Sequence, residues 1–248
     1  MIRALLLLLG LALPAAAEEV VAGLSQSSVA ITANFDGTEI LIFGAVKRFE
    51  PIPAGELQVI VTVAGPNQEV TVRRKARRFG IWINSDHVDV DAAPSFYAVA
   101  TTAPWNQVIT DTEDLRYRIS IPRAIRSVGA AVSDSPSFTE ALIRIRSAHG
   151  LYLTLPETVT LSEDTLFSTA VQLPANLIEG NYRTRIFLTR EGRVVDEYET
   201  EIGVQKTGLE RWLFRLSQEA PLAYGILAIV LAISAGWAAS AAFRYMRS

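Results

Sequence analysis

Five positive charges within six positions are the residues of this sequence best suited to binding chemistry. They are Arg73, Arg74, Lys75, Arg77 and Arg78. Because the run stands between two segments with strand-like alternation, we expect it on the surface, in a loop or at a strand end. Guanidinium groups match oxyanions, so the run is a candidate patch for an anion, for lipid headgroups or for an acidic partner surface. The alternative is a solvated edge whose charges prevent strand-to-strand aggregation.

A second set with ligand chemistry lies between residues 86 and 91. In a strand, His87, Asp89 and Asp91 would share one face. Val88 and Val90 would then point to the core. A histidine and two carboxylates can hold a divalent metal, but strand residues four apart are separated by about 13 Å, too far to share one ion. We therefore expect a solvated strand face, and neither a metal nor a cofactor.

Sequence signatures of an enzyme are missing. The 248 residues contain two histidines and no cysteine, which excludes thiol catalysis and disulfides. Nucleophile-elbow, zinc-protease and phosphate-loop motifs are absent as well. Glu18 and Glu19 stand in a polar stretch that we expect to be exposed, and His149 suits a helix C-terminus. We predict that the protein is not an enzyme, and its net charge of −3 gives no support for nucleic-acid binding.

Three aromatic residues are candidates for an interface. They are Phe96, Tyr97 and Trp105. Tyrosine and tryptophan are favoured at interfaces, although most buried aromatic side chains belong to the core.

The elements that must position these residues begin with an apolar N-terminus. Residues 1–17 hold Arg3, a leucine-rich run and the small residues Ala15 and Ala17, which is the layout of a cleaved signal peptide. The apolar run is too short to cross a bilayer core of about 30 Å, so an uncleaved anchor is the weaker alternative. We expect the mature chain to begin at Glu18.

The second apolar segment is residues 222–243, which contain no charged residue. At about 1.5 Å per residue they can cross a bilayer, whereas a buried helix of this length would normally carry a polar stripe. The tail at 244–248 holds Arg244 and Arg247, and positive residues mark the cytoplasmic side. The sequence thus predicts a single-pass membrane protein whose N-terminal region is exported and whose short C-terminal tail stays in the cytoplasm.

Two further features accompany the span. Residues 207–221 predict an amphipathic helix at the membrane surface, or a plain helical linker. Small residues on one face of the span let helices approach closely, so the span can pair with a partner or with a second copy, although alanine is common in spans. This candidate helix-pairing face comprises Ala228, Ala232, Gly236 and Ser240.

Between these segments the pattern is mostly period two. Strands are predicted at 28–35, 38–46, 57–64, 69–73, 79–84, 88–90 and 95–101, with turns between them. This favours an immunoglobulin-like β-sandwich module over 18–104. Residues 105–150 predict a helical connecting segment, with helices at 111–115 and 137–146, the second capped by Ser137 and Glu140.

Strand patterns return after the helical segment. They occupy 152–154, 158–161, 166–173, 181–189 and 194–204, with a hairpin turn at 191–192. Residues 151–206 therefore form a second β module or complete the first, and we favour the second module. The predicted fold class is mainly β, with a short helical insertion and one C-terminal transmembrane helix.

Residues 31–46, 95–104 and 150–195, together with the leader and the span, resemble a family of predicted transmembrane proteins from alphaproteobacteria. The resemblance covers essentially the whole mature chain and carries no catalytic motif. It implies a Gram-negative inner membrane with the β region in the periplasm. It also implies association with a permease that resembles sulfite or organosulfonate exporters.

We therefore expect a membrane protein whose β region binds a protein partner, as an accessory subunit of a permease or envelope complex. The alternative is a periplasmic module that binds or senses an anion or other ligand, and an enzyme ranks third. The expected partners are a membrane protein or a second copy of the span, and the lipid bilayer, but not nucleic acid.

Overall fold

The computed structural model describes residues 18–32, 35–48, 51–126, 135–206, 213 and 216–246. The chain divides into two units, one with nearly all of the β structure and one with the C-terminal helix. The predicted leader at 1–17 and most of the predicted amphipathic helix at 207–221 lie outside the described residues.

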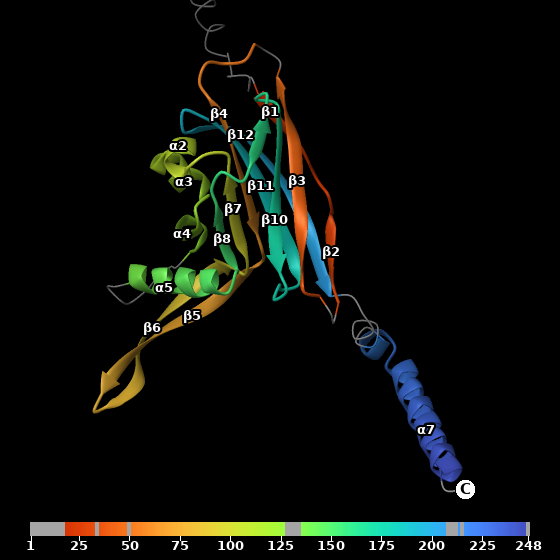
Figure 1. Ribbon diagram of the computed structural model, residues 1–248. Helices are drawn as coiled ribbons and strands as arrows, with labels where there is room; N and C mark the ends of the chain where they lie inside the picture. The colour runs from red at the N-terminus through yellow and green to blue at the C-terminus, as the bar shows by residue number, and fades with distance from the viewer. Residues whose placement is uncertain are drawn as a thin grey trace, which may run out of the picture. The chain divides into compact units, whose positions relative to one another are not determined.

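The described residues form twelve strands, and a run of short helices separates the first seven from the last five (Figure 1). The strands before the helices are β1 (Glu18–Leu24), β2 (Ser28–Ile31), β3 (Gly37–Arg48), β4 (Leu57–Ala64), β5 (Asn67–Arg78), β6 (Ile81–Pro94) and β7 (Tyr97–Thr101). The helices are α2 (Trp105–Val108), α3 (Asp111–Tyr117), α4 (Ile121–Ala124) and α5 (Ser135–Ala148). The later elements are β8 (Tyr152–Leu155), β9 (Thr160–Ser162), β10 (Leu166–Pro174), β11 (Gly180–Arg190), β12 (Arg193–Lys206) and α7 (Pro221–Met246).

The strands form three sheets. One has the order β1-β3-β10-β9, the second has the order β2-β12-β11-β4-β7-β8, and the third consists of β5 and β6. β3 is antiparallel to β10 and β4 is antiparallel to β11, whereas β7 and β8 run parallel. Strands from 18–104 and from 151–206 therefore share both large sheets. The C-terminal strands complete the sheets of the N-terminal ones, rather than forming the separate module that the sequence favoured.

The two large sheets lie face to face, with β1 against β11 and β10 against β7 (Figure 1). In β10 every second residue is buried, because successive side chains of a strand point to opposite faces and only one face of β10 is covered. β4 is buried along nearly its whole length, since the other sheet covers one of its faces and the helices cover the other. The prediction of a mainly β fold with a helical insertion is confirmed, and the immunoglobulin-like type stays a prediction.

Helices α2, α3 and α4 form a layer on the outer face of the six-stranded sheet (Figure 1). Side chains from the sheet fix this layer by hydrogen bonds to carbonyls of the helices and of the turn between α3 and α4. The Tyr97 hydroxyl donates to the carbonyl of Ile119 at 2.8 Å, and the Thr189 hydroxyl donates to that of Val108 at 2.6 Å. Arg185 donates to the carbonyl of Tyr117 at 2.9 Å. Contacts with the sheet thus hold these helices in position, since helices this short are not stable by themselves.

Helix α5 packs on the base of the β5–β6 hairpin. Phe138 and Leu142 bury against Val72, Val88 and Val90. The predicted helix is confirmed, but the capping box at Ser137 is wrong, because the helix already begins at Ser135. Proline suits the first helical turn, and Pro136 there favours the earlier start.

The C-terminal helix α7 contains a stretch, Pro221–Ser240, that is long and apolar enough to cross a membrane. Its backbone continues to Met246, three residues past the predicted end of the span. The four small residues of the candidate helix-pairing face are exposed along it, and whether that face pairs stays a prediction.

Candidate functional site

The β5–β6 hairpin extends away from the two large sheets (Figure 1). Its turn is made by Phe79 and Gly80, whose φ angles are 50° and 86°. A two-residue hairpin turn with positive φ at both positions matches the twist of the strands, and glycine adopts the second position without strain. The turn places Phe79 at the apex, fully exposed to solvent.

The basic run does not lie in a loop: it forms the C-terminal half of β5, up to the last residue of that strand, and is paired to β6. Arg73 pairs with His87, Arg77 with Trp82 and Arg78 with Ile81. Consecutive charges have no period-two apolar pattern, because this part of the ribbon has no buried face. The pattern that reveals the other strands is therefore absent here.

A β-bulge divides the hairpin into two parts. The register shifts between Arg74 and Lys75, which leaves Ser85 as the extra residue. Below the bulge the ribbon packs on α5, and beyond it both faces are exposed. We define residues 75–84, beyond the bulge, as the hairpin tip.

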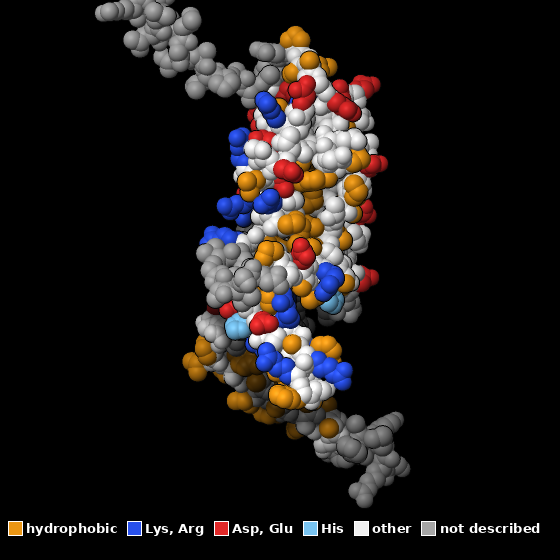
Figure 2. All heavy atoms as spheres, turned by 90° about the vertical axis from the view of Figure 1, so that its left-hand side faces the viewer, with side chains coloured by type: hydrophobic (Ala, Val, Ile, Leu, Met, Phe, Trp, Pro, Cys, Tyr) orange, Lys and Arg blue, Asp and Glu red, His pale blue; other side chains and the backbone are white. Residues whose placement is uncertain are grey.

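The hairpin tip exposes large apolar side chains next to cations. The exposed fraction is 64% for Ile81, 68% for Trp82 and 38% for Ile83, in addition to the apical Phe79. These residues belong to the turn and to β6, whereas the cations lie on β5. Figure 2 shows one side of the molecule, and at its lower end Lys and Arg side chains lie beside hydrophobic ones.

The five predicted patch residues do not act alike. The Arg74 guanidinium lies 4.5 Å from the centre of the Phe138 ring and donates to the Ser137 hydroxyl at 2.6 Å. Arg74 is therefore part of the packing of α5 on the hairpin. The other four lie along the exposed ribbon: Arg73, Lys75, Arg77 and Arg78.

The alternating face at 87–91 is arranged as predicted, with Val88 and Val90 buried and the polar residues between them exposed. The Thr71 hydroxyl donates to the Asp89 carboxylate at 2.6 Å. Among the residues that the structure describes, no three His, Cys, Asp or Glu side chains are placed to hold a metal ion.

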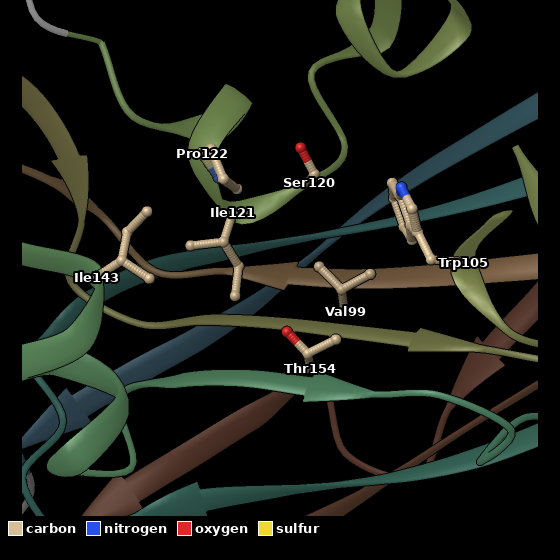
Figure 3. Close-up of a pocket in the computed structure, with 7 residues that line it drawn as sticks. All are labelled: Val99, Trp105, Ser120, Ile121, Pro122, Ile143 and Thr154. Carbon is tan, nitrogen blue, oxygen red and sulfur yellow. The ribbon is translucent and has the colours of Figure 1, made fainter. Parts of the chain in front are cut away.

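A second candidate surface is a pocket of about 320 Å³ in the helical layer, here called the helical-layer pocket (Figure 3). Strands β7 and β8 supply its floor, and the helices and the turn before α4 supply its walls. The lining residues are Val99, Trp105, Ser120, Ile121, Pro122, Ile143 and Thr154.

One wall of the helical-layer pocket is fixed by Asp114. Its carboxylate accepts hydrogen bonds from the backbone N–H of Ile119 at 3.2 Å and of Ser120 at 2.7 Å. The Ser120 hydroxyl donates to the same carboxylate at 2.7 Å. The left-handed conformation of Arg118, with φ of 53°, ends α3 and lets the chain turn back onto this carboxylate.

The helical-layer pocket is suited to an uncharged group. None of its seven lining side chains ionises in the physiological range. One of its two hydroxyls, that of Ser120, is already bonded to Asp114. Of the three aromatic residues predicted at an interface, Trp105 lines this pocket, half-buried, whereas Phe96 and Tyr97 are in the core.

The expectation that Glu18 is exposed is wrong. Its side chain is buried and accepts hydrogen bonds from Arg190 and Arg48, each at 2.8 Å. The bonds from Arg190 hold the pKa of this carboxyl below its usual value against the opposing effect of burial, and Arg48 adds to the lowering. Such a carboxylate stays ionised and suits a structural role. Sequence alone gave no signal, since both partners are distant in the chain.

Comparison with known proteins identifies the family of this chain. None of the curated proteins matches its sequence. The solved structure of Spo0M, a sporulation control protein from Bacillus subtilis, is similar at 10% identity with a TM-score of 0.29. That similarity covers 82% of this chain and 55% of Spo0M, so the chain spans little more than half the length of that protein. The model of the family described as "Putative transmembrane protein (Alph_Pro_TM)" matches residues 19–245. The chain therefore belongs to this transmembrane protein family.

Proposed function

We propose that this protein is a single-span inner-membrane protein whose periplasmic β region, of immunoglobulin-like type, binds a protein partner. Its role is that of an accessory subunit of a permease or envelope complex. Membership of a transmembrane family and the apolar stretch of α7 support the anchoring of the chain. The two arginines that follow the span support a cytoplasmic C-terminus.

Signal-peptide cleavage after Ala17 belongs to this proposal. The first strand starts at Glu18, and the side chain of Glu18 is built into the core of the β region. A cut after Ala17 keeps this residue, whereas a later cut would remove it. N-terminal sequencing of the protein recovered from membranes is expected to start at Glu18.

The main support for a protein partner is the helical-layer pocket. A site for a small molecule normally places a few convergent polar groups that fix the orientation of the ligand. Here the lining is mainly apolar, and the Ser120 hydroxyl is engaged within the protein. Burial of one large apolar side chain next to a tryptophan is typical of the anchors of protein–protein interfaces. The lining therefore favours a protein over an anion, and binding over catalysis.

Photo-crosslinking in native membranes tests this proposal. A photoreactive amino acid at Ile143, in the wall of the helical-layer pocket, is expected to capture one membrane-associated protein. The matched control is the same amino acid at Leu41, an exposed apolar residue on β3 of the other large sheet. Thr154→Arg places a charge in the pocket at an exposed position, and we expect it to lower capture about tenfold or more. Capture from Leu41 at the same level, or none from Ile143, would overturn the proposal.

A further inference from the structure

We propose that the hairpin tip is a second membrane contact, which inserts its apolar side chains into the headgroup region of an anionic bilayer. The cations of β5 would bind the lipid phosphates. This inference does not depend on the protein partner at the helical-layer pocket, because the two surfaces share no residue.

The distribution of apolar side chains around the ribbon favours a bilayer over a protein groove. Successive residues of a strand point to opposite faces, so Ile81 and Trp82 lie on different faces of the hairpin tip. A protein groove usually covers one face of a strand pair, whereas lipid surrounds an inserted element on all sides. Phe79 at the apex would enter first, since the turn places it ahead of both strands.

The cations suit the same environment. Arg77 lies opposite Trp82 and Arg78 opposite Ile81, so each of these two apolar side chains has an arginine as its cross-strand neighbour. Long basic side chains can extend from apolar surroundings to the phosphates, and tryptophan favours the interface between lipid and water. None of the described carboxylates forms an ion pair with Arg73, Lys75, Arg77 or Arg78. Each cation near an anionic bilayer raises affinity by about fivefold.

Two further features favour contact between the hairpin tip and a bilayer. One is the membrane span of the chain, and the other is the exposure of the apolar side chains of the tip. The chain belongs to a transmembrane family, and a span holds the β region near a lipid surface at high effective concentration. A two-stranded ribbon alone is marginally stable in water. Beyond the bulge, β5 and β6 have no described neighbour other than each other that would bury their apolar side chains.

The absence of cysteine makes a site-specific test direct. Phe79→Cys in the full chain gives a single thiol for an environment-sensitive dye. In vesicles that contain phosphatidylglycerol, we expect the dye to shift to the blue and to be quenched by lipids that carry a quencher in the upper acyl chain. The same dye at Leu41→Cys is the matched control and is expected to remain in water. In phosphatidylcholine vesicles the signal at position 79 should fall.

Two charge measurements complete the test. The double variant Arg77→Glu and Arg78→Glu, in the Phe79→Cys chain, is expected to lose the lipid quenching, by about 25-fold or more in affinity for two removed cations. Raising the salt from 0.1 M to 1 M shortens the screening length from about 10 Å to 3 Å and should weaken the contact likewise. Circular dichroism checks that the variants fold.

The outcomes separate this inference from the proposed function. Absence of lipid quenching at position 79 in anionic vesicles overturns the membrane contact. A blue shift that needs native membrane proteins and is absent with lipid alone also overturns it, in favour of a protein at the hairpin tip. Neither result changes the capture expected from Ile143, which tests the helical-layer pocket.

Discussion

Glu18 is the first residue of β1, and its carboxylate lies between guanidinium groups from two other strands. Arg48 comes from β3 and Arg190 from β11, which belongs to the opposite sheet. Glu18 is 3% exposed and Arg190 is 7% exposed. The three charges therefore link the two large sheets where solvent hardly screens them, and the loss of one partner leaves the others uncompensated.

The substitution Glu18→Gln tests the contribution of this buried charge to stability. The amide keeps the shape but removes the negative charge that faces two guanidinium groups. Breaking a buried pair in this way costs about 3–5 kcal/mol of the free energy of unfolding, measured by urea denaturation. Glu19→Gln is the matched control, since Glu19 is half exposed and its contact with Lys47 spans 3.6 Å, and it should change stability by less than about 1 kcal/mol. Equal effects of the two substitutions would contradict a buried triad.

The same carboxylate makes stability depend on pH. The folded-state pKa of Glu18 is lowered from its ordinary value of 4.5, chiefly by the bonds from Arg190. The unfolded state therefore binds the proton at a higher pH than the folded state does. The stabilising contribution is present above pH 4.5 and is lost as the pH falls through the lower folded-state pKa. Urea denaturation between pH 7 and pH 3 should show a steeper acid decline for the wild type than for Glu18→Gln.

At the scale of elements, Gly44 fixes how closely β3 packs against its neighbours. A Cβ atom there would lie 2.5 Å from the Phe167 ring and 2.7 Å from the Val21 carbonyl oxygen. Gly44→Ala is therefore expected to lower the free energy of unfolding by about 1–3 kcal/mol. Gly203→Ala on β12 is the control, because its Cβ would meet only the Ser27 carbonyl oxygen at 3.9 Å. The control should be neutral or stabilising by less than about 1 kcal/mol, and a similar loss in both would argue against the close approach.

How well an element could be predicted from sequence depended on what buries it. β4 was predicted at its observed bounds, 57–64, because a strand buried on both faces is a continuous apolar run. β5 was predicted to end at Arg73 but continues to Arg78, since hydrogen bonds to β6 hold a ribbon that no core covers. Of the residues that line the helical-layer pocket, only Trp105 could be named as a candidate from the sequence. The others come together only when β7, β8 and three helices meet.

At the scale of the whole molecule, the order of strands in the sheets does not follow their order in the chain. β3 lies between β1 and β10, and β4 lies between β11 and β7. Strands distant in sequence are thus hydrogen-bonded neighbours at the centre of each large sheet. Local periodicity could not predict this, because it reports the faces of a strand and not its neighbours.

This topology predicts which part of the chain folds as a unit. Residues 18–206 contain every strand of the three sheets and should unfold in one cooperative transition with urea. Residues 18–150 keep all of the first seven strands but lose β10, which pairs with β3, and β11, which pairs with β4. The loss of β11 also removes the buried side chains of Tyr182 and Phe187. The shorter fragment should therefore show no cooperative transition and should elute as an expanded or aggregated species. A cooperative transition in 18–150 would instead identify an independent N-terminal module, in which the pairing of β3 with β10 is not needed for folding.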